Sequence, residues 1–158
     1  MNSKNLLLPL LVLLTFSVSA KEKEVVIDSL HVKGGIYMLK GQGGNIGLFT
    51  DKDGLFMIDG QYAPLTEKIK AAIKAISASP IKFLINTHWH GDHVGGNQNF
   101  AHTGAIIIAH KNVRKRMSSE QRIKLFNKKV KPSPDSALPV ITFGDEIELS
   151  SKHTRSGE

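Results

Sequence analysis

The chain contains 158 residues and carries a formal net charge of +7, and this length predicts a single domain. Hydrophobic residues make up 41% of the chain and charged residues 22%, a composition that is ordinary for a globular protein and argues against general disorder. There is no cysteine, which excludes disulfides, thiolate metal ligands and a lipid anchor on an N-terminal cysteine.

Residues 1–20 have the pattern of a secretory signal peptide. Lys4 gives a positive start, an apolar run follows from Leu6 to Phe16, and small residues precede an expected cleavage after Ala20. The apolar run is shorter than the ~20 residues that a membrane span needs, so we expect no stable membrane anchor after cleavage. We expect the mature chain to be periplasmic or secreted.

Apolar segments and turn-forming segments alternate between residues 21 and 86, which predicts strands and one helix. Isoleucines recur at helical spacing within residues 64–77 and charged side chains lie between them, so this segment is expected to be an amphipathic helix. A helix between two strands predicts a crossover with parallel pairing. Glycine-rich residues 41–45 form a turn whose spacing does not match a phosphate-binding loop. The expected strands are residues 25–32, 35–40, 45–50, 55–58 and 81–85.

The most informative stretch follows the last of these strands, where three histidines and an aspartate fall within six residues. His88 and His90 are two positions apart, so in an extended segment their side chains point to the same side. Gly91 permits a sharp turn, after which Asp92 and His93 can face a nearby second point. Imidazole nitrogens and a carboxylate oxygen suit zinc, and suit iron or manganese less exclusively. The alternative is a polar loop whose histidines cap a helix or bond to the backbone.

The run His88-Trp89-His90-Gly91-Asp92-His93 resembles the His-x-His-x-Asp-His signature of the metallo-β-lactamase superfamily, and its flanks Asn86-Thr87 and Gly95-Gly96-Asn97 are similar as well. The resemblance implies an α/β (α+β) fold, namely the N-terminal half of an αββα sandwich with a mixed sheet flanked by helices. It also implies a secreted hydrolase with one or two zinc ions. In such an enzyme a metal-bound hydroxide attacks an ester, an amide such as a β-lactam, a thioester or a phosphoester in a small-molecule substrate.

The same resemblance assigns roles to particular residues. His88 and His90 would hold the first metal ion, and Asp92 and His93 the second, with Asp92 also acting in catalysis by orienting the attacking hydroxide. An aspartate at the end of an Ile-Asp-Gly strand would lie near the metal and hold a ligand histidine in one tautomer. Here that residue is Asp59, and the alternative is a simple turn aspartate. We expect His31 and His102 at the surface and His110 in a structural role.

Basic residues dominate residues 111–131, which carry nine lysines and arginines against one glutamate. Val113 and Met117 are four apart, which predicts a helix with a narrow apolar side. We interpret the charge as a solvated surface, and the alternative is a basic module that binds an anionic partner, either nucleic acid or a membrane surface. We expect no nucleic-acid partner, because aromatic side chains do not alternate with the cations. Residues 97–100 are expected to form a short helix or turn, and residues 105–109 a buried strand.

The resemblance covers residues 21–149 as a partial domain and gives way to an atypical polar tail at residues 150–158. The arms of an expected hairpin around Gly144-Asp145 are residues 140–143 and 146–149. A complete family member would add a second sheet and further metal ligands. The alternative function is therefore a truncated, catalytically incompetent metal-binding fragment. The uncovered apolar face of its sheet would be exposed to solvent, which predicts marginal stability and self-association.

Overall fold

The structure is a computed structural model that describes residues 24–150. The expected signal peptide lies outside the described residues, as does the polar tail after Ser150. Within the described part of the chain, no helix is both long enough and apolar enough to cross a membrane.

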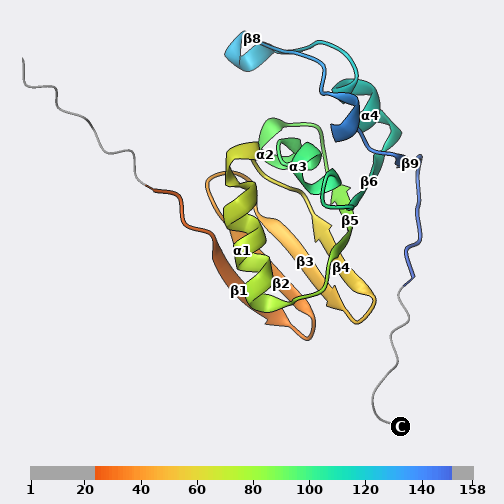
Figure 1. The fold of residues 1–158 in the computed structure, drawn as a ribbon. Coiled ribbons are helices and arrows are strands. Elements are labelled where there is room, and N and C mark those ends of the chain that lie inside the picture. Colours follow the sequence, from red (N-terminus) through yellow and green to blue (C-terminus); the bar gives the residue numbers. More distant parts are fainter. Residues whose placement is uncertain (1–23, 151–158) are drawn as a thin grey trace, which may run out of the picture.

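Seven strands form one mixed sheet, in the order β1-β2-β3-β4-β5-β6-β9 (Figure 1). The first four strands pair antiparallel with their neighbours in sequence, whereas β4, β5, β6 and β9 are parallel. The strands are β1 (Asp28–Lys33), β2 (Ile36–Lys40), β3 (Ile46–Asp51), β4 (Gly54–Ile58), β5 (Ile81–Asn86), β6 (Ile106–His110) and β9 (Ile141–Phe143).

Helices connect the parallel strands. The longest, α1 (Thr66–Ile76), follows a short 3-10 turn at Ala63–Leu65 and links β4 to β5. Two short helices, α2 (Gly91–Val94) and α3 (Asn97–Ala101), link β5 to β6. After β6 come α4 (Lys111–Met117), a separate hairpin of β7 (Gln121–Ile123) and β8 (Lys128–Val130), and 3-10 turns at Lys124–Phe126 and Asp135–Ala137.

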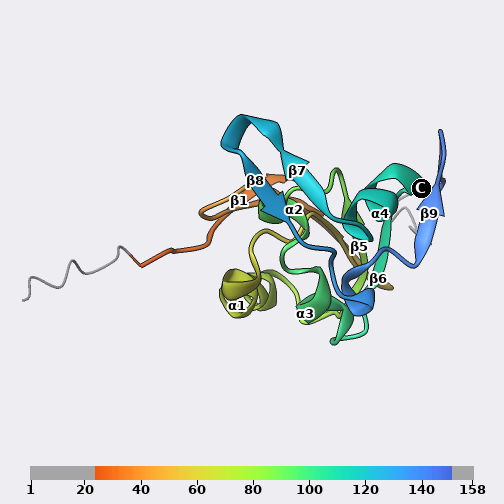
Figure 2. The same ribbon diagram turned by 90° about the horizontal axis from the view of Figure 1, so that it is seen from above.

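One face of the sheet is covered by α1 and α3, which lie on the same side of it (Figure 2). Ile69 and Ile73 of α1 and Phe100 of α3 join the buried strand residues in one core cluster. Leu39 and Met57, which belong to that cluster, are fully buried. The helix is amphipathic because its isoleucines face this cluster while Glu67 and Lys74 remain exposed.

The opposite face of the sheet is also apolar. Four of its isoleucines are exposed, its phenylalanines are half-buried and Ile108 is fully buried. Two rows of paired residues cross this face from strand to strand. The rows are Ile36, Phe49, Phe56, Phe83 and Ile106, and then Ile58, Ile85, Ile108 and Ile141.

The expected fold class is confirmed, as are the helix, the five strands before the motif and the parallel crossover. The prediction of a hairpin around Gly144-Asp145 is wrong. Residues 141–143 instead pair in parallel with β6, and residues 146–149 are not a strand. The physical reason is that β6 offers an open edge to residues 141–143, and a strand that pairs there does not need a second arm.

Candidate metal centre

The histidine-rich loop lies at the carboxyl ends of β4 and β5, where parallel strands commonly present functional side chains. β5 ends at Asn86, residues 87–90 form a bend, and α2 begins at Gly91. His90 is extended, with φ −69° and ψ 150°, and is the residue that precedes α2. The first turn of α2 lies against the end of β4, since the backbone N–H of Gly60 donates to the carbonyl of His93 at 2.7 Å.

The four residues predicted to bind metal come together at this point. The ring centroid of His88 lies 4.7 Å from that of His90 and 3.9 Å from that of His93. His93 Nε2 lies 3.4 Å from Asp92 Oδ2. His90 is exposed and the other three are half-buried, so solvent reaches the cluster from one side.

Asp59 lies beneath this cluster with only 3% of its surface exposed. Its Oδ2 lies 2.8 Å from His93 Nδ1, and its Oδ1 accepts a 2.9 Å bond from the backbone N–H of Thr87. A carboxylate only accepts hydrogen bonds, so the Asp59 contact places a proton of His93 on Nδ1. Asp59 itself has a left-handed φ of 62°, which turns its side chain from the end of β4 toward the loop.

A second bond extends this arrangement to His88. The hydroxyl of Thr87 donates to Asp59 Oδ2 at 2.7 Å and lies 3.1 Å from His88 Nδ1. Because that hydroxyl gives its proton to the carboxylate, it can only accept from His88. Its contact therefore also places the proton of His88 on Nδ1 and leaves Nε2 available. One buried carboxylate orients both imidazoles, the first directly and the second through Thr87.

The glycine-rich turn between β2 and β3 packs against the cluster from the other side. A Cβ added to Gly44 would lie 2.4 Å from His93 Cε1, and one added to Gly43 would lie 2.8 Å from the Cβ of Asp92. Only glycine therefore lets this turn approach so closely. Gln61, which is fully buried, fixes the approach by donating from Nε2 to the carbonyl of Gly44.

A buried pair of amides holds β5 to α3. Asn86 Nδ2 donates to Asn97 Oδ1 at 3.0 Å, and Asn97 Nδ2 donates to Asn86 Oδ1 at 2.8 Å. Asn97 also donates to the carbonyl of Ala137 at 3.0 Å. Neither side chain is more than 3% exposed. The pair fixes the two ends of the loop at residues 87–96 relative to each other.

The pKa of His88 is lowered from its ordinary value, first by burial and then by the positive charges of His93 and His90 when these are protonated. Both causes favour the neutral imidazole. A neutral imidazole is the form that binds a metal ion.

The comparisons with known proteins agree with this fold. A model of the metallo-β-lactamase superfamily matches residues 39–155. The chain belongs to this superfamily. A comparison with curated protein sequences finds no match.

Solved structures of metallo-β-lactamases have a similar fold. The class B3 di-zinc enzyme LRA-12 from an Alaskan soil metagenome matches with a TM-score of 0.65 and 21% identity, over 83% of this chain and 52% of that one. A B3 enzyme described as the first with an active-site glutamic acid gives 0.64 and 24%, over 77% and 48%. An enzyme from Cronobacter sakazakii gives 0.62 and 19%, over 82% and 49%. The chain spans about half the length of these solved structures.

The residue types of the cluster fit the zinc ions expected for this superfamily, since imidazole and carboxylate are both zinc ligands. The two orienting bonds of Asp59 and Thr87 fit as well, because metal-bound histidines usually donate their other ring N–H to such partners. The side-chain positions fit less well. Within residues 24–150, no group of three or more His, Cys, Asp or Glu side chains is arranged so that it could hold a metal ion.

Among residues 24–150, the histidines outside the motif take the roles expected from the sequence. His31 and His102 are exposed. His110 is structural, because its Nδ1 accepts from the backbone N–H of Asn112 and caps α4. The sequence alone does not indicate the roles of Thr87, Gln61 and Gly44 at this site. The available signals were a hydroxyl directly before the first motif histidine and a glutamine directly after Asp59-Gly60.

Proposed function

We propose that this chain carries the metal-ligand loop of a secreted, zinc-dependent hydrolase that acts on small molecules. The observation that supports this most is the gathering of His88, His90 and His93 above the buried carboxylate of Asp59, within 3.9–4.7 Å between ring centroids. His88 and His90 would hold one zinc ion, and Asp92 and His93 a second. A bound zinc ion would lower the pKa of water to roughly 7 and polarise a carbonyl or phosphoryl group.

The protein's own contribution is orientation. Asp59 and Thr87 hold the rings of His93 and His88 through Nδ1, so less conformational entropy is lost when the other ring nitrogens bind a metal ion. Asp92 lies beside His93 with its carboxylate half-buried. In this position Asp92 Oδ2 would accept a hydrogen bond from the attacking water and hold it toward the substrate.

The proposed substrates are esters, amides including β-lactams, thioesters and phosphoesters. A β-lactam is included because the similar solved structures are metallo-β-lactamases. That argument rests on a shared fold, and one fold hosts many substrates.

The test is hydrolysis by the zinc-loaded mature chain of a chromogenic cephalosporin, a lactone, a thioester and a phosphodiester. We expect turnover of at least one substrate, its loss on addition of a chelator, and its abolition by His88→Ala. His102→Ala is the matched control, because His102 is exposed and lies outside the cluster. Turnover that survives His88→Ala would contradict the proposal.

A second candidate is a chain that binds metal weakly and has no turnover. This candidate is favoured because, among the described residues, no three His, Cys, Asp or Glu side chains are placed so that they could hold one metal ion. Zinc that binds weakly, depends on His88 and gives no hydrolysis of any of the four substrates would support this candidate. Two equivalents of zinc retained through dialysis would contradict it.

A further inference from the structure

The hairpin of β7 and β8 stands apart from the seven-stranded sheet. Its two strands pair only with each other: Gln121 is opposite Val130, and Ile123 is opposite Lys128. Both ribbon views show it extending beyond the body of the molecule (Figures 1 and 2). Asn127, with a left-handed φ of 46°, closes the tip, and its side chain accepts a hydrogen bond from Arg122. The hairpin is therefore an ordered projection with its own internal bonds.

The tip of this hairpin is apolar. Leu125 is 85% exposed and Phe126 is 72% exposed. Leu125 is the most exposed large hydrophobic residue among residues 24–150. Neither side chain belongs to a core cluster of the described chain. Two adjacent apolar side chains at the end of a projection are unfavourable in water, and their exposure indicates a partner that would cover them.

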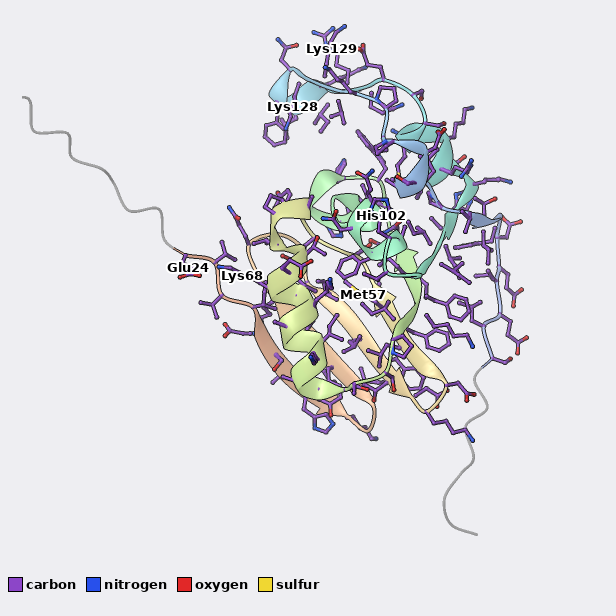
Figure 3. The ribbon with its side chains drawn as sticks, viewed as in Figure 1. Glu24, Met57, Lys68, His102, Lys128 and Lys129 are labelled. Carbon is purple, nitrogen blue, oxygen red and sulfur yellow. The ribbon has the colours of Figure 1, made fainter. Side chains whose placement is uncertain are left out.

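The stem that carries this tip is basic. Residues 121–131 contain five cations and no acidic residue. Lys129 pairs with Glu120 at 3.0 Å, but both side chains are well exposed, so that pair is weak. No acidic side chain of the described residues pairs with Lys124, Lys128 or Lys131. Figure 3 shows Lys128 and Lys129 at the hairpin, far from the sheet.

We propose that the hairpin Gln121–Val130 binds the surface of an anionic phospholipid bilayer. Leu125 and Phe126 would enter the boundary between headgroups and acyl chains, and the surrounding lysines would contact lipid phosphates. Leucine and phenylalanine beside lysines and arginines is the combination that peripheral membrane elements use. Such contact is reversible and differs from the membrane-spanning anchor that the sequence argues against. It also does not depend on the proposed hydrolase activity.

Nucleic acid is the competing polyanion, and the side chains favour lipid over it. Binding to single strands relies on several aromatic platforms along a basic groove, whereas Phe126 is the one aromatic residue within residues 111–131. An exposed leucine next to it has no role on a phosphate backbone. In a bilayer both apolar side chains are buried at once, and the cations lie at the depth of the phosphates.

The experiment is co-sedimentation of the zinc-loaded mature chain with vesicles of phosphatidylcholine alone and of phosphatidylcholine mixed equally with phosphatidylglycerol. We expect binding to the mixed vesicles to be at least ~10-fold stronger than to the neutral ones, since each lysine near an anionic surface contributes roughly fivefold. Equal binding to the two vesicle types, or no binding to either, would overturn the proposal.

Two variants separate the apolar and the charged contributions. Leu125→Ser/Phe126→Ser keeps the charge and should lower binding to mixed vesicles at least ~10-fold. Its control is Val26→Ser/Val140→Ser, which removes two exposed apolar residues elsewhere. Lys124→Gln/Lys128→Gln/Lys129→Gln should lower binding on the order of 100-fold. Its control changes the exposed lysines 33, 40 and 74 to glutamine, with the same loss of charge.

Insertion itself is tested with Phe126→Trp. We expect its emission to shift to the blue on mixed vesicles and to be quenched by brominated acyl chains, whereas the wild type, whose single tryptophan is Trp89, should not change. An unquenched Phe126→Trp would overturn insertion. Tighter binding to an oligonucleotide than to mixed vesicles, unaffected by Leu125→Ser/Phe126→Ser, would assign the hairpin to nucleic acid and overturn the proposal. Circular dichroism confirms that each variant is folded.

Discussion

Asp59 Oδ2 lies 2.8 Å from His93 Nδ1, and the same oxygen accepts a 2.7 Å bond from the hydroxyl of Thr87. Asp59 lies at the end of β4, and its two partners lie in the segment that follows β5. Thr87 is 28 residues from Asp59 in sequence and His93 is 34 residues from it. A single carboxylate thus sets the orientation of the loop and of two of its imidazoles.

We expect Asp59→Asn to weaken zinc binding by ~10–100-fold, the usual cost of losing a carboxylate behind a metal-bound histidine. An asparagine amide would have to face the N–H of His93 and the hydroxyl of Thr87, and it can no longer accept strongly from both. The measurement is a competition titration with a chromogenic chelator. Asp53→Asn, at an exposed turn, removes the same charge and should leave affinity unchanged. An equal loss in both variants would show that only net charge matters.

Thr87→Val tests whether the hydroxyl relays orientation to His88. Valine has the same shape but no hydroxyl, so it breaks the bonds to Asp59 and to His88 Nδ1 while leaving the backbone bond from Thr87 in place. We expect zinc affinity to fall about 10-fold. Thr87→Ser restores the hydroxyl and should restore most of that affinity. If serine and valine give the same affinity, the hydroxyl does not act as the relay.

The pKa of His88 predicts a pH dependence of stability for the metal-free protein. Because burial and the neighbouring histidines lower this pKa in the folded state, the unfolded chain takes up a proton first as pH falls below about 6.5. The contribution of His88 to stability is therefore complete above that pH and decreases below it, until the folded-state pKa is passed.

The measurement is urea unfolding of the chelator-treated protein at several pH values, together with an NMR titration of the His88 ring. We expect His88→Gln to lose less stability than the wild type as the solution is acidified below pH ~6.5. A His88 ring that titrates above the ordinary histidine range would contradict this sign.

The sequence predicts the site better than it predicts the end of the fold. The spacing of His88, His90, Asp92 and His93 after an apolar strand was sufficient to locate the cluster, because strand alternation and the turn at Gly91 act over a few residues. The role of Asp59 is implied by the resemblance of its Ile-Asp-Gly strand ending to the superfamily. The role of Thr87 is not implied in this way, since it depends on a carboxylate 28 residues away.

The region after β6 shows why other elements were missed. Residues 141–143 pair in parallel with the edge of β6. The local sequence does not encode which sheet edge is available for pairing. The β7–β8 hairpin has no apolar alternation, and its turn depends on a left-handed Asn127 rather than on a glycine. Gly44 looked like an ordinary turn residue, although the space beside it is filled by the ring of His93.

The buried amide pair provides a prediction about stability. Asn97→Ala removes three hydrogen bonds and leaves the side chain of Asn86 and the carbonyl of Ala137 without these partners. Leaving such groups buried and unsatisfied costs ~1–3 kcal/mol, which urea unfolding can measure. The control is Gln98→Ala, whose bond to the hydroxyl of Ser136 is exposed.

The double variant Asn86→Ala/Asn97→Ala distinguishes a coupled pair from two independent residues. Because the second change removes a group that the first left unsatisfied, we expect its cost to be clearly below the sum of the two single costs. Additive costs would show that the two amides stabilise the loop separately.

The exposed face of the sheet leads to the last prediction, which concerns self-association. Phe49, Phe56 and Phe83 form a ladder across it, with ring centroids 5.9 Å and 5.1 Å apart, and Ile58 beside them is 42% exposed. A face of this kind is more apolar than a monomer surface usually is, and two copies can pack face to face as sheets do in a sandwich.

We therefore expect residues 21–158 to dimerise or aggregate as the protein concentration rises, which sedimentation velocity can follow. Ile58→Lys places a charge in the middle of the face and should weaken this association at least ~10-fold, because burying an unpaired charge is costly. Ala75→Lys adds the same charge at an exposed position of α1 on the other side of the sheet and should have no such effect. A wild-type chain that stays monomeric at every concentration would show that the face is stable in water.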